Sequence, residues 1–352
     1  MNILIIKLSA IGDVLHTLPA ANSLRAKFPE ARLTWLVEEA AAPLVVDHPA
    51  LDRVLVSRRK TWIRQMRTGS AGPAPRAARD FIRQLRDTRY DIILDFQGLL
   101  KSGLLIGLAR GGRKIGFGKG MQHQEHSYLF LNERLPAISM EIHALDRNLR
   151  MLEPLGITTT DITYHLPVSD QDRKAMRKRV RTGADDPEGR IAAINPMAKW
   201  DTKLWETEKF ARLADLMVEQ GYRIFLTGDR GDQAENDRIC AAMNHPAVNL
   251  AGRTTLLELA ALYELADLVI STDTGPMHLA AAVGTPVVAL FGPTAPWRTG
   301  PYGDRHRVVR LELECSPCYK RTCDTRRCMR KISVEEVLAA VGELAGIFHQ
   351  SI

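Results

Sequence analysis

Four loops of this 352-residue chain gather residue types that acid–base and phosphate chemistry use. The first loop, residues 7–13, follows an apolar run and ends in Gly12-Asp13. Asp13 stands where a helix should begin, so capping that helix is its simplest structural role. Its carboxylate also suits a general base that removes a proton from a hydroxyl. Gly12 permits close approach of a ligand, and Lys7 is a candidate to bind a phosphate or carboxylate.

The second loop, residues 271–282, leads from an apolar run into a helix. Small and polar residues fill its turn: Asp273, Thr274, Gly275, Pro276, Met277 and His278. Pro276 fits the first helical position, and the free N–H groups around it should point at one spot, which favours a diphosphate. His278 could donate to a phosphate oxygen, whereas Asp273 would repel phosphate and is expected to face sugar hydroxyls. The structural alternative is a capped helix without a ligand.

The third loop, residues 195–205, carries Lys199 and Lys203 directly after an expected strand. Lysines at a strand end suit phosphate binding, and either could neutralise a leaving diphosphate without a metal. The fourth loop, residues 227–232, includes Asp229, which could accept hydrogen bonds from ribose hydroxyls. An ordinary surface turn explains that loop equally well.

Strands and helices alternate along the chain, which predicts parallel sheets covered by helices. We expect strands at residues 2–7, 32–37, 91–95, 190–195, 223–227, 267–271 and 285–291. The expected helices are residues 13–27, 81–88, 99–109, 206–220, 256–266, 277–283 and 334–348. The pattern restarts in the second half, so the predicted class is α/β with two similar domains, residues 1–168 and 169–332, followed by a final helical segment, 333–352.

Charge and glycine content separate several classes of protein. Lys and Arg number 48 against 41 Asp and Glu, giving a net charge of +7. The basic stretch that contains Arg58, Arg59, Lys60 and Arg64 suits an anionic partner: phosphorylated lipid, a membrane surface or nucleic acid. A nucleic-acid-binding protein is one rival, but neither an aromatic RNA-binding motif nor a recognition helix accompanies the charge. An NAD-dependent oxidoreductase is another, and the absence of G-x-G-x-x-G argues against it, so we expect no cofactor.

Four of the five cysteines form C-x2-C-x4-C-x4-C at Cys315, Cys318, Cys323 and Cys328. A tetrahedral zinc site is one interpretation, and buried thiols or redox pairing are the alternatives. We expect no metal in the reaction itself. The start of the chain lacks a signal-peptide cleavage site, and no apolar run approaches the ~20 residues that span a bilayer. The expected location is the cytoplasm, with peripheral contact to the inner membrane.

Three motifs occur in a fixed order along the chain. They are K-x-S-x-x-G-D-V-x-H-x-L-P-A at residues 7–20, N-P-x-A-x-W-x-x-K-x-W at 195–205, and S-T-D-T-G-P-M-H-L-A-A-A at 271–282, the last followed by G-T-P-V-V-A-L-F-G-P-T at 284–294. Together they resemble the family-9 glycosyltransferases, the lipopolysaccharide heptosyltransferases. The resemblance implies a GT-B fold, in which two Rossmann-like domains face each other across a cleft. It also implies that the final helix crosses back to the N-terminal domain.

The resemblance assigns roles residue by residue. It makes Asp13 the catalytic base, Lys203 and the 274–278 loop the contacts to the donor diphosphate, and Asp273 the contact to the donor sugar. Lys7, Ser9 and Gly12 fall in the acceptor-side motif, and the basic stretch 58–64 fits the phosphates and carboxylates of Kdo-lipid A. Lys199 stands where some relatives have a hydroxyl residue. The acid that binds the donor adenosine stays open among Asp229, Asp232 and Glu235.

The implied reaction transfers L-glycero-D-manno-heptose from ADP-heptose to the Kdo/heptose inner core of lipopolysaccharide by an inverting, metal-independent displacement. The expected partners are that donor, Kdo-lipid A or its heptosylated product, and the inner face of the membrane, without nucleic acid. A GT-B nucleotide-sugar epimerase, or a transferase with another donor, is the alternative. Addition of the first heptose is favoured, with the second close behind.

Overall fold

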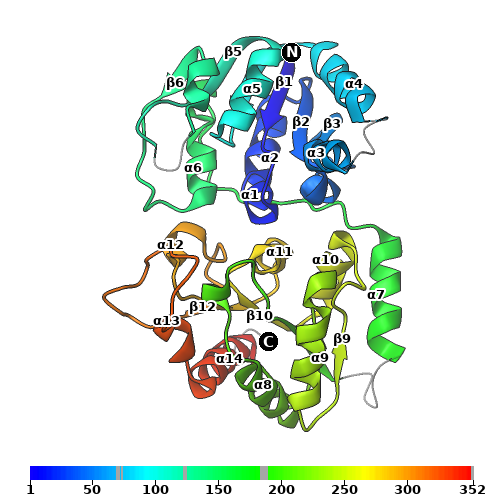
Figure 1. The fold of residues 1–352 in the computed structure, drawn as a ribbon, viewed down its shortest axis with the longest axis vertical. Helices are drawn as coiled ribbons and strands as arrows, with labels where there is room; N and C mark the ends of the chain where they lie inside the picture. Colours follow the sequence, from blue (N-terminus) through cyan, green and yellow to red (C-terminus); the bar gives the residue numbers. More distant parts are fainter. Residues whose placement is uncertain (69–71, 73, 122–124, 183–188, 350–352) are drawn as a thin grey trace. The chain divides into compact units, whose positions relative to one another are not determined.

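The computed structural model describes residues 1–68, 72, 74–121, 125–182 and 189–349 (Figure 1). Its contacts divide the chain into two compact units, Met1–Pro167 and Val168–Ile352. This boundary lies one residue before the predicted one. Each unit is built on a six-stranded sheet whose strands are all parallel.

The sheet of the first unit has the strand order β3-β2-β1-β4-β5-β6. The strands are β1 Asn2–Ile6, β2 Arg32–Glu38, β3 Arg53–Ser57, β4 Arg89–Asp95, β5 Arg110–Phe117 and β6 Glu133–Leu135. β1 is central and buried, as its continuous apolar run predicts for a parallel strand covered on both faces. β3, β5 and β6 were not predicted, because they lie toward the edges and carry fewer apolar residues.

Helices and short 3₁₀ turns surround this sheet. They are α1 Ile11–Leu15, α2 Leu18–Lys27, α3 Arg59–Arg67, α4 Ala74–Arg86, α5 Leu100–Leu108 and α6 Ala144–Arg150, with η1 Glu39–Leu44, η2 Ser127–Phe130 and η3 Glu153–Leu155. One core cluster joins Leu4 and Ile6 of β1 to Phe81 of α4 and Ile106 of α5, with Trp62 of α3 packed against it. These three helices therefore cover the same face of the sheet.

The single helix expected at residues 13–27 is two helices, α1 and α2. Pro19 explains the break, because proline has no N–H to bond to the carbonyl four residues earlier and its ring clashes with that carbonyl. Thr17 lies at the break, where its hydroxyl donates to the Asp13 carbonyl at 2.8 Å. The break leaves α1 as a single short turn that holds Asp13 close to the end of β1.

The second unit repeats the same arrangement, with strand order β12-β11-β10-β7-β8-β9. Read from its own first strand, this is the order of the first unit. Its strands are β7 Arg190–Asn195, β8 Tyr222–Leu226, β9 Ala247–Asn249, β10 Leu268–Thr272, β11 Val287–Leu290 and β12 His306–Val309. The predicted strands 190–195, 223–227, 267–271 and 285–291 correspond to β7, β8, β10 and β11.

The helices of this unit are α7 Asp170–Thr182, α8 Thr207–Glu219, α9 Gln233–Ala242, α10 Leu256–Leu265, α11 Gly275–Ala282, α12 Pro296–Thr299, α13 Arg327–Arg330 and α14 Val334–His349, with η4 Asp201–Lys203 and η5 Arg230–Asp232. Within the described part of the chain, no helix combines the length and the apolar character that crossing a bilayer requires.

The final helix, α14, has one apolar side, which packs within the second unit. Its apolar side, with Val337, Val341 and Leu344, belongs to the core of the second unit and packs against α8, β11 and β12. That the final segment, 333–352, also crosses back to the first unit stays a prediction. The spacing of these residues by four and three positions forms one helical stripe, which the second unit buries.

Candidate functional site

In each sheet the strand order reverses between two central strands. Predicted loops of each unit lie at that point of its own sheet. The strand order reverses between β1 and β4 in the first unit and between β7 and β10 in the second. Open α/β sheets bind ligands outside the carboxyl ends of their strands at such switch points. The loops after β1, β7 and β10 were predicted from the sequence. The loop after β4 was not predicted, and its Gln97 side chain makes hydrogen bonds to the loop after β1 at the first switch point.

Asp13 is half-buried in α1, and one oxygen of its carboxylate accepts a hydrogen bond from the backbone N–H of Ala10 at 2.9 Å. This contact is the capping role that the sequence offered as the structural alternative. A carboxylate held in this way retains its second oxygen and further lone pairs for a substrate hydroxyl. Gly12 beside it is buried. The role of Asp13 as a general base stays a prediction.

Lys7 lies at the end of β1, 8% exposed, and its ammonium donates to the Phe96 carbonyl at 2.9 Å. The Trp35 indole N–H donates in turn to the Lys7 carbonyl at 3.0 Å. Because Phe96 contributes a neutral carbonyl, this contact leaves the positive charge of Lys7 uncancelled beside the switch point. The charge favours an anion there, although Lys7 is less accessible than a surface ligand would be.

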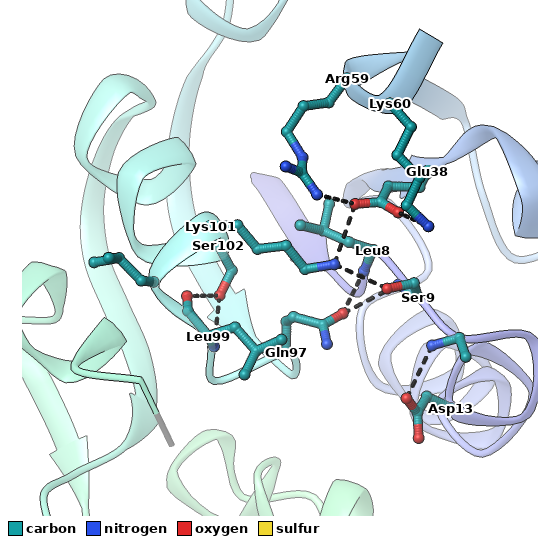
Figure 2. A network of polar contacts seen from close by, with 12 residues as sticks. Leu8, Ser9, Asp13, Glu38, Arg59, Lys60, Gln97, Leu99, Lys101 and Ser102 are labelled. Atoms are coloured by element: carbon teal, nitrogen blue, oxygen red, sulfur yellow. Dashed lines mark hydrogen bonds and ion pairs between the residues drawn. The ribbon is translucent and has the colours of Figure 1, made fainter. Parts of the chain in front are cut away.

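Gln97, on the loop after β4, fixes the loop that leads to Asp13 (Figure 2). Its side-chain oxygen accepts the N–H groups of Leu8 at 2.9 Å and Ser9 at 3.1 Å. Gln97 is itself held by buried Asp95, whose carboxylate accepts the N–H groups of Gln97 and Gly98, each at 3.1 Å. Burial raises the pKa of Asp95 above its ordinary value of 3.8. Gln97 was not predicted, because the residues that it contacts lie 89 and 88 positions away in the chain.

Gln97→Leu is expected to lower the free energy of unfolding by about 1–3 kcal/mol, because two partly buried N–H groups lose their acceptor. Any activity that depends on Asp13 should fall with it, since the loop that carries Asp13 is no longer held. Gln97→Glu keeps an acceptor oxygen and should retain more stability. Urea unfolding measures the difference, and Gln84→Leu on the exposed side of α4 is the matched control. Equal midpoints for Gln97→Leu and the control would contradict the role assigned to Gln97.

Glu38 collects three cations at the end of β2 (Figure 2). Its side chain is 5% exposed, and its oxygens lie 3.1 Å from Lys101, 3.3 Å from Lys60 and 3.4 Å from Arg59. Burial acts to raise the pKa of Glu38, but the hydrogen bond and charge of Lys101, together with Lys60, outweigh burial and lower it below 4.5. One acid facing three cations leaves this spot net positive. We call Glu38, Arg59, Lys60 and Lys101 the Glu38 cluster.

Lys101 links the Glu38 cluster to the first loop, because its ammonium also donates to the Ser9 hydroxyl at 2.9 Å. The structure thus brings predicted Ser9, Arg59 and Lys60 together through Glu38 and Lys101, which the sequence analysis missed. The only hint of these two residues in the sequence was their position, because Glu38 ends an apolar strand and Lys101 lies in the first turn of a helix.

The other two predicted cations lie outside the Glu38 cluster. Arg58 pairs with Glu39 at 3.5 Å, and Arg64 is exposed one turn further along α3. The cations of the predicted basic stretch 58–64 therefore do not all lie in one place. Part of it borders the switch point, and Arg64 extends the positive charge outward.

Lys203 and Asp273 meet in the second unit, although 70 residues separate them. The Lys203 ammonium lies 2.6 Å from a carboxylate oxygen of Asp273, and that oxygen also accepts the Thr294 hydroxyl at 2.6 Å. The Lys203 side chain is 14% exposed and that of Asp273 is 7% exposed. The ammonium also lies 4.6 Å from the ring centroid of Trp200. Loops after β7 and β10 thus join a cation and an acid at the second switch point.

Helix α11 begins at Gly275, two residues after Asp273. Thr274 occupies the N-cap in an extended conformation, and Pro276 is the second helical residue, one position after the predicted one. The Met277 N–H donates to the Thr274 carbonyl at 3.2 Å, and the Met277 side chain is fully buried. The expectation that this N–H is free was therefore wrong, because the first turn closes on itself. Thr274, Gly275 and His278 remain the candidates for a diphosphate, with His278 only 9% exposed.

The remaining donor-side predictions are dispersed. Lys199 is exposed on its loop. Asp229 is exposed at the N-cap of η5, where it accepts the Gly231 N–H at 2.6 Å, while Asp232 accepts the Asp229 N–H at 2.7 Å. Burial raises the pKa of Asp232. Glu235 pairs with Arg238 at 2.7 Å and lines a cavity of about 310 Å³ between the loop after β7 and α8. None of these contacts shows which of the three acids binds the donor adenosine.

The cysteine loop is fastened to the donor-side loops. The Cys318 N–H donates to the Pro293 carbonyl at 3.0 Å, the Thr202 hydroxyl to the Lys320 carbonyl at 2.9 Å, and Arg326 to the Asp201 carbonyl at 3.2 Å. All of the cysteines are free thiols: Cys315 and Cys323 are exposed, Cys318 is partly buried and Cys328 is buried. Among the residues that the structure describes, no three histidine, cysteine or acidic side chains converge as metal ligands do. The geometry therefore gives the zinc hypothesis no support.

The model of glycosyltransferase family 9 (heptosyltransferase) matches residues 78–328, which is most of the chain. The chain belongs to this family. Like the three motifs, the match spans both units, and it includes the loops after β4, β7 and β10. The resemblance to family-9 glycosyltransferases is thus confirmed. The oxidoreductase and nucleic-acid-binding rivals do not account for this match.

Named relatives of this family-9 glycosyltransferase point the same way. Lipopolysaccharide heptosyltransferase 1 of Pseudomonas aeruginosa is 30% identical over 92% of this chain and 87% of that protein. The structure of the Escherichia coli heptosyltransferase WaaC with ADP has a TM-score of 0.78 at 26% identity, covering 98% of this chain and all of that one. The same enzyme with ADP-2-deoxy-2-fluoro heptose gives 0.76 at 27% identity, covering 97% and 99%. These likenesses confirm the predicted α/β, GT-B class.

Proposed function

We propose that this family-9 glycosyltransferase transfers L-glycero-D-manno-heptose from ADP-heptose to the Kdo/heptose inner core of lipopolysaccharide. The observation that carries the proposal is the contact of Lys203 with Asp273 at 2.6 Å, two residues before α11 begins. It sets a cation for a diphosphate beside a carboxylate for sugar hydroxyls. The relatives that bind ADP or an ADP-heptose analogue, and those named for lipopolysaccharide, support this choice of donor and acceptor.

In this proposal the donor diphosphate lies at the N-terminus of α11. Helix N-termini carry a partial positive charge and free N–H groups, both of which favour an anion. Thr274, Gly275 and His278 contact the phosphates, and Lys203 turns from Asp273 toward the leaving diphosphate. Asp273 then accepts hydrogen bonds from the heptose hydroxyls. Charge on the leaving group is neutralised by Lys203 and the helix, so the reaction needs no metal ion.

The acceptor binds at the first switch point, where Lys7, Arg58, Arg59, Lys60 and Arg64 supply positive charge for its phosphates and carboxylates. Asp13 removes the proton of the attacking hydroxyl, whose oxygen forms a bond to the anomeric carbon as the bond to ADP breaks. Attack from the face opposite the departing diphosphate inverts the configuration. General-base assistance of this kind contributes on the order of 10²–10⁴ in rate.

The test is a transfer assay with purified enzyme, ADP-heptose and Kdo2-lipid A, read by mass spectrometry. The expected product is the acceptor plus one heptose, with release of ADP and no requirement for divalent metal. The monoheptosylated product, offered as the second acceptor, decides between first and second heptose. ADP should raise the melting temperature and UDP should not. Conversion of the donor without an acceptor would instead indicate an epimerase.

We also infer a cytoplasmic enzyme in peripheral contact with the inner membrane. The acceptor is a lipid held in that membrane, so the proposed reaction takes place at its surface.

A further inference from the structure

The helices α3, α4 and α5 form a single layer, because they pack on the same face of the first sheet and share one core cluster. η2 joins this layer, since Tyr128 and Phe130 pack on the same cluster and η2 contacts α5. Their outward sides therefore form one continuous surface, which we call the α3–α5 surface. Two unusual features meet on it.

The first feature is an arginine stripe on α4. Arg76, Arg79, Arg83 and Arg86 are exposed, and their spacing of three, four and three residues places them on one side of the helix. Phe81 and Leu85, which face the core, lie on the other side. Arg83 has a surface pair with Asp80 at 2.9 Å, an interaction of small energy because both side chains are exposed. The arginine stripe is thus a concentrated positive charge.

The second feature is a leucine ridge on α5 and η2. Leu100, Leu104 and Leu108 recur every fourth residue with exposures of 44%, 53% and 39%, and Leu129 is 63% exposed. Phe130 anchors η2 to α5 so closely that a Cβ added at Gly103 would lie 2.7 Å from its ring. This anchoring keeps Leu129 beside the helix. Because α4 contacts α5, the leucine ridge and the arginine stripe are neighbours.

We propose that the α3–α5 surface docks onto an anionic lipid bilayer, with the leucine ridge in the headgroup–acyl boundary and the arginine stripe on lipid phosphates. Apolar side chains beside basic ones are the pattern of interfacial membrane binding. A protein partner fits less well, because leucine, the residue that forms the ridge, is under-represented among the residues that carry most of the binding energy at protein interfaces. A basic exposed helix does not by itself bring apolar residues to the surface: α7 has more Lys and Arg residues than α4, yet it carries no exposed large apolar residue among those described. The proposal rests on the proposed lipid-linked acceptor.

The experiment is vesicle co-sedimentation of the full chain, with vesicles of phosphatidylethanolamine and phosphatidylglycerol compared with phosphatidylcholine alone. The wild type should bind the anionic vesicles, with affinity falling as salt rises. Removing three charges with Arg76→Gln, Arg79→Gln and Arg86→Gln should weaken binding by on the order of a hundredfold. Leu100→Ser, Leu104→Ser and Leu108→Ser should weaken it at least about tenfold. None of these residues belongs to the proposed reaction machinery.

The matched control removes the same number of charges from another basic helix, with Lys174→Gln, Arg177→Gln and Arg181→Gln on α7. It should bind vesicles as the wild type does. An equal loss in this control or no binding by the wild type would overturn the proposal. So would a wild type that forms a dimer in solution and becomes a monomer in the leucine variant, because the ridge would then be an interface between two copies of the chain. Transfer to a deacylated, water-soluble acceptor separates the two hypotheses: it should survive in every variant, and its absence from the wild type would refute the reaction instead.

Discussion

Asp13→Asn is expected to lower the transfer rate by on the order of a thousandfold, the loss that removal of a general base produces. Asparagine keeps an oxygen that can accept the Ala10 N–H, so the capping contact at 2.9 Å survives. It cannot take the proton of the acceptor hydroxyl. Single-turnover measurements with ADP-heptose would report the rate, and circular dichroism with thermal melting would report the fold. Binding of ADP should be unchanged.

A second aspartate supplies the control for this prediction. Asp172 in α7 accepts the N–H of the residue three positions before it, Ser169, at 3.0 Å, as Asp13 does from Ala10. Asp172→Asn makes the same chemical change in the same kind of cap, away from the proposed reaction. It should leave turnover at the wild-type value. Near-normal turnover by Asp13→Asn would remove Asp13 from the mechanism and leave it as a cap.

Lys203→Met is expected to lower kcat by about 10²–10³, because a preorganised charge that stabilises the leaving group is lost. The same change leaves the Asp273 carboxylate buried with the Thr294 hydroxyl but without its cation. Breaking a buried ion pair from one side costs about 3–5 kcal/mol, and the partial exposure of Lys203 reduces that cost. Stability and activity should therefore both fall. Urea unfolding and the transfer assay measure them separately.

A double variant distinguishes the chemical role of Lys203 from its structural one. Lys203→Met combined with Asp273→Asn removes the unpaired charge and should restore much of the lost stability. Activity should stay low, because neither the cation nor the carboxylate returns. Recovery of activity together with stability would show that Lys203 acts only through the fold. Lys199→Met, on the same loop but exposed, is the control and should have a smaller effect.

The sequence predicted the parts of the fold that follow from local pattern. The apolar runs that became β1, β7, β8 and β10 are central strands, and a strand buried on both faces has to be apolar throughout. The loops with Asp13, Lys203 and Asp273 were found because small and charged residues directly follow those runs. Edge strands such as β6 and β9 were missed, since three residues with partial burial give no periodic signal.

Contacts between distant strands could not be predicted in this way. Gln97 contacts the first loop because β4 lies next to β1, and the residues around Gln97 in the chain do not predict that these two strands pair. Glu38 and Lys101 meet for the same reason, 63 residues apart. The order of the strands in the sheet decides both contacts.

The Glu38 cluster has a thermodynamic consequence for an anionic acceptor. The side chains of Lys60 and Arg59 are 71% and 45% exposed, whereas that of Lys101 is 22% exposed. An arriving phosphate can draw the two outer cations away while Lys101 continues to compensate Glu38. Binding of the acceptor then exchanges one ion pair for another, because Lys60 and Arg59 leave Glu38 and pair with the phosphate. The net binding enthalpy should therefore be small. Affinity would arise mainly from released water and small ions, and isothermal titration would record a weak enthalpy beside a favourable entropy.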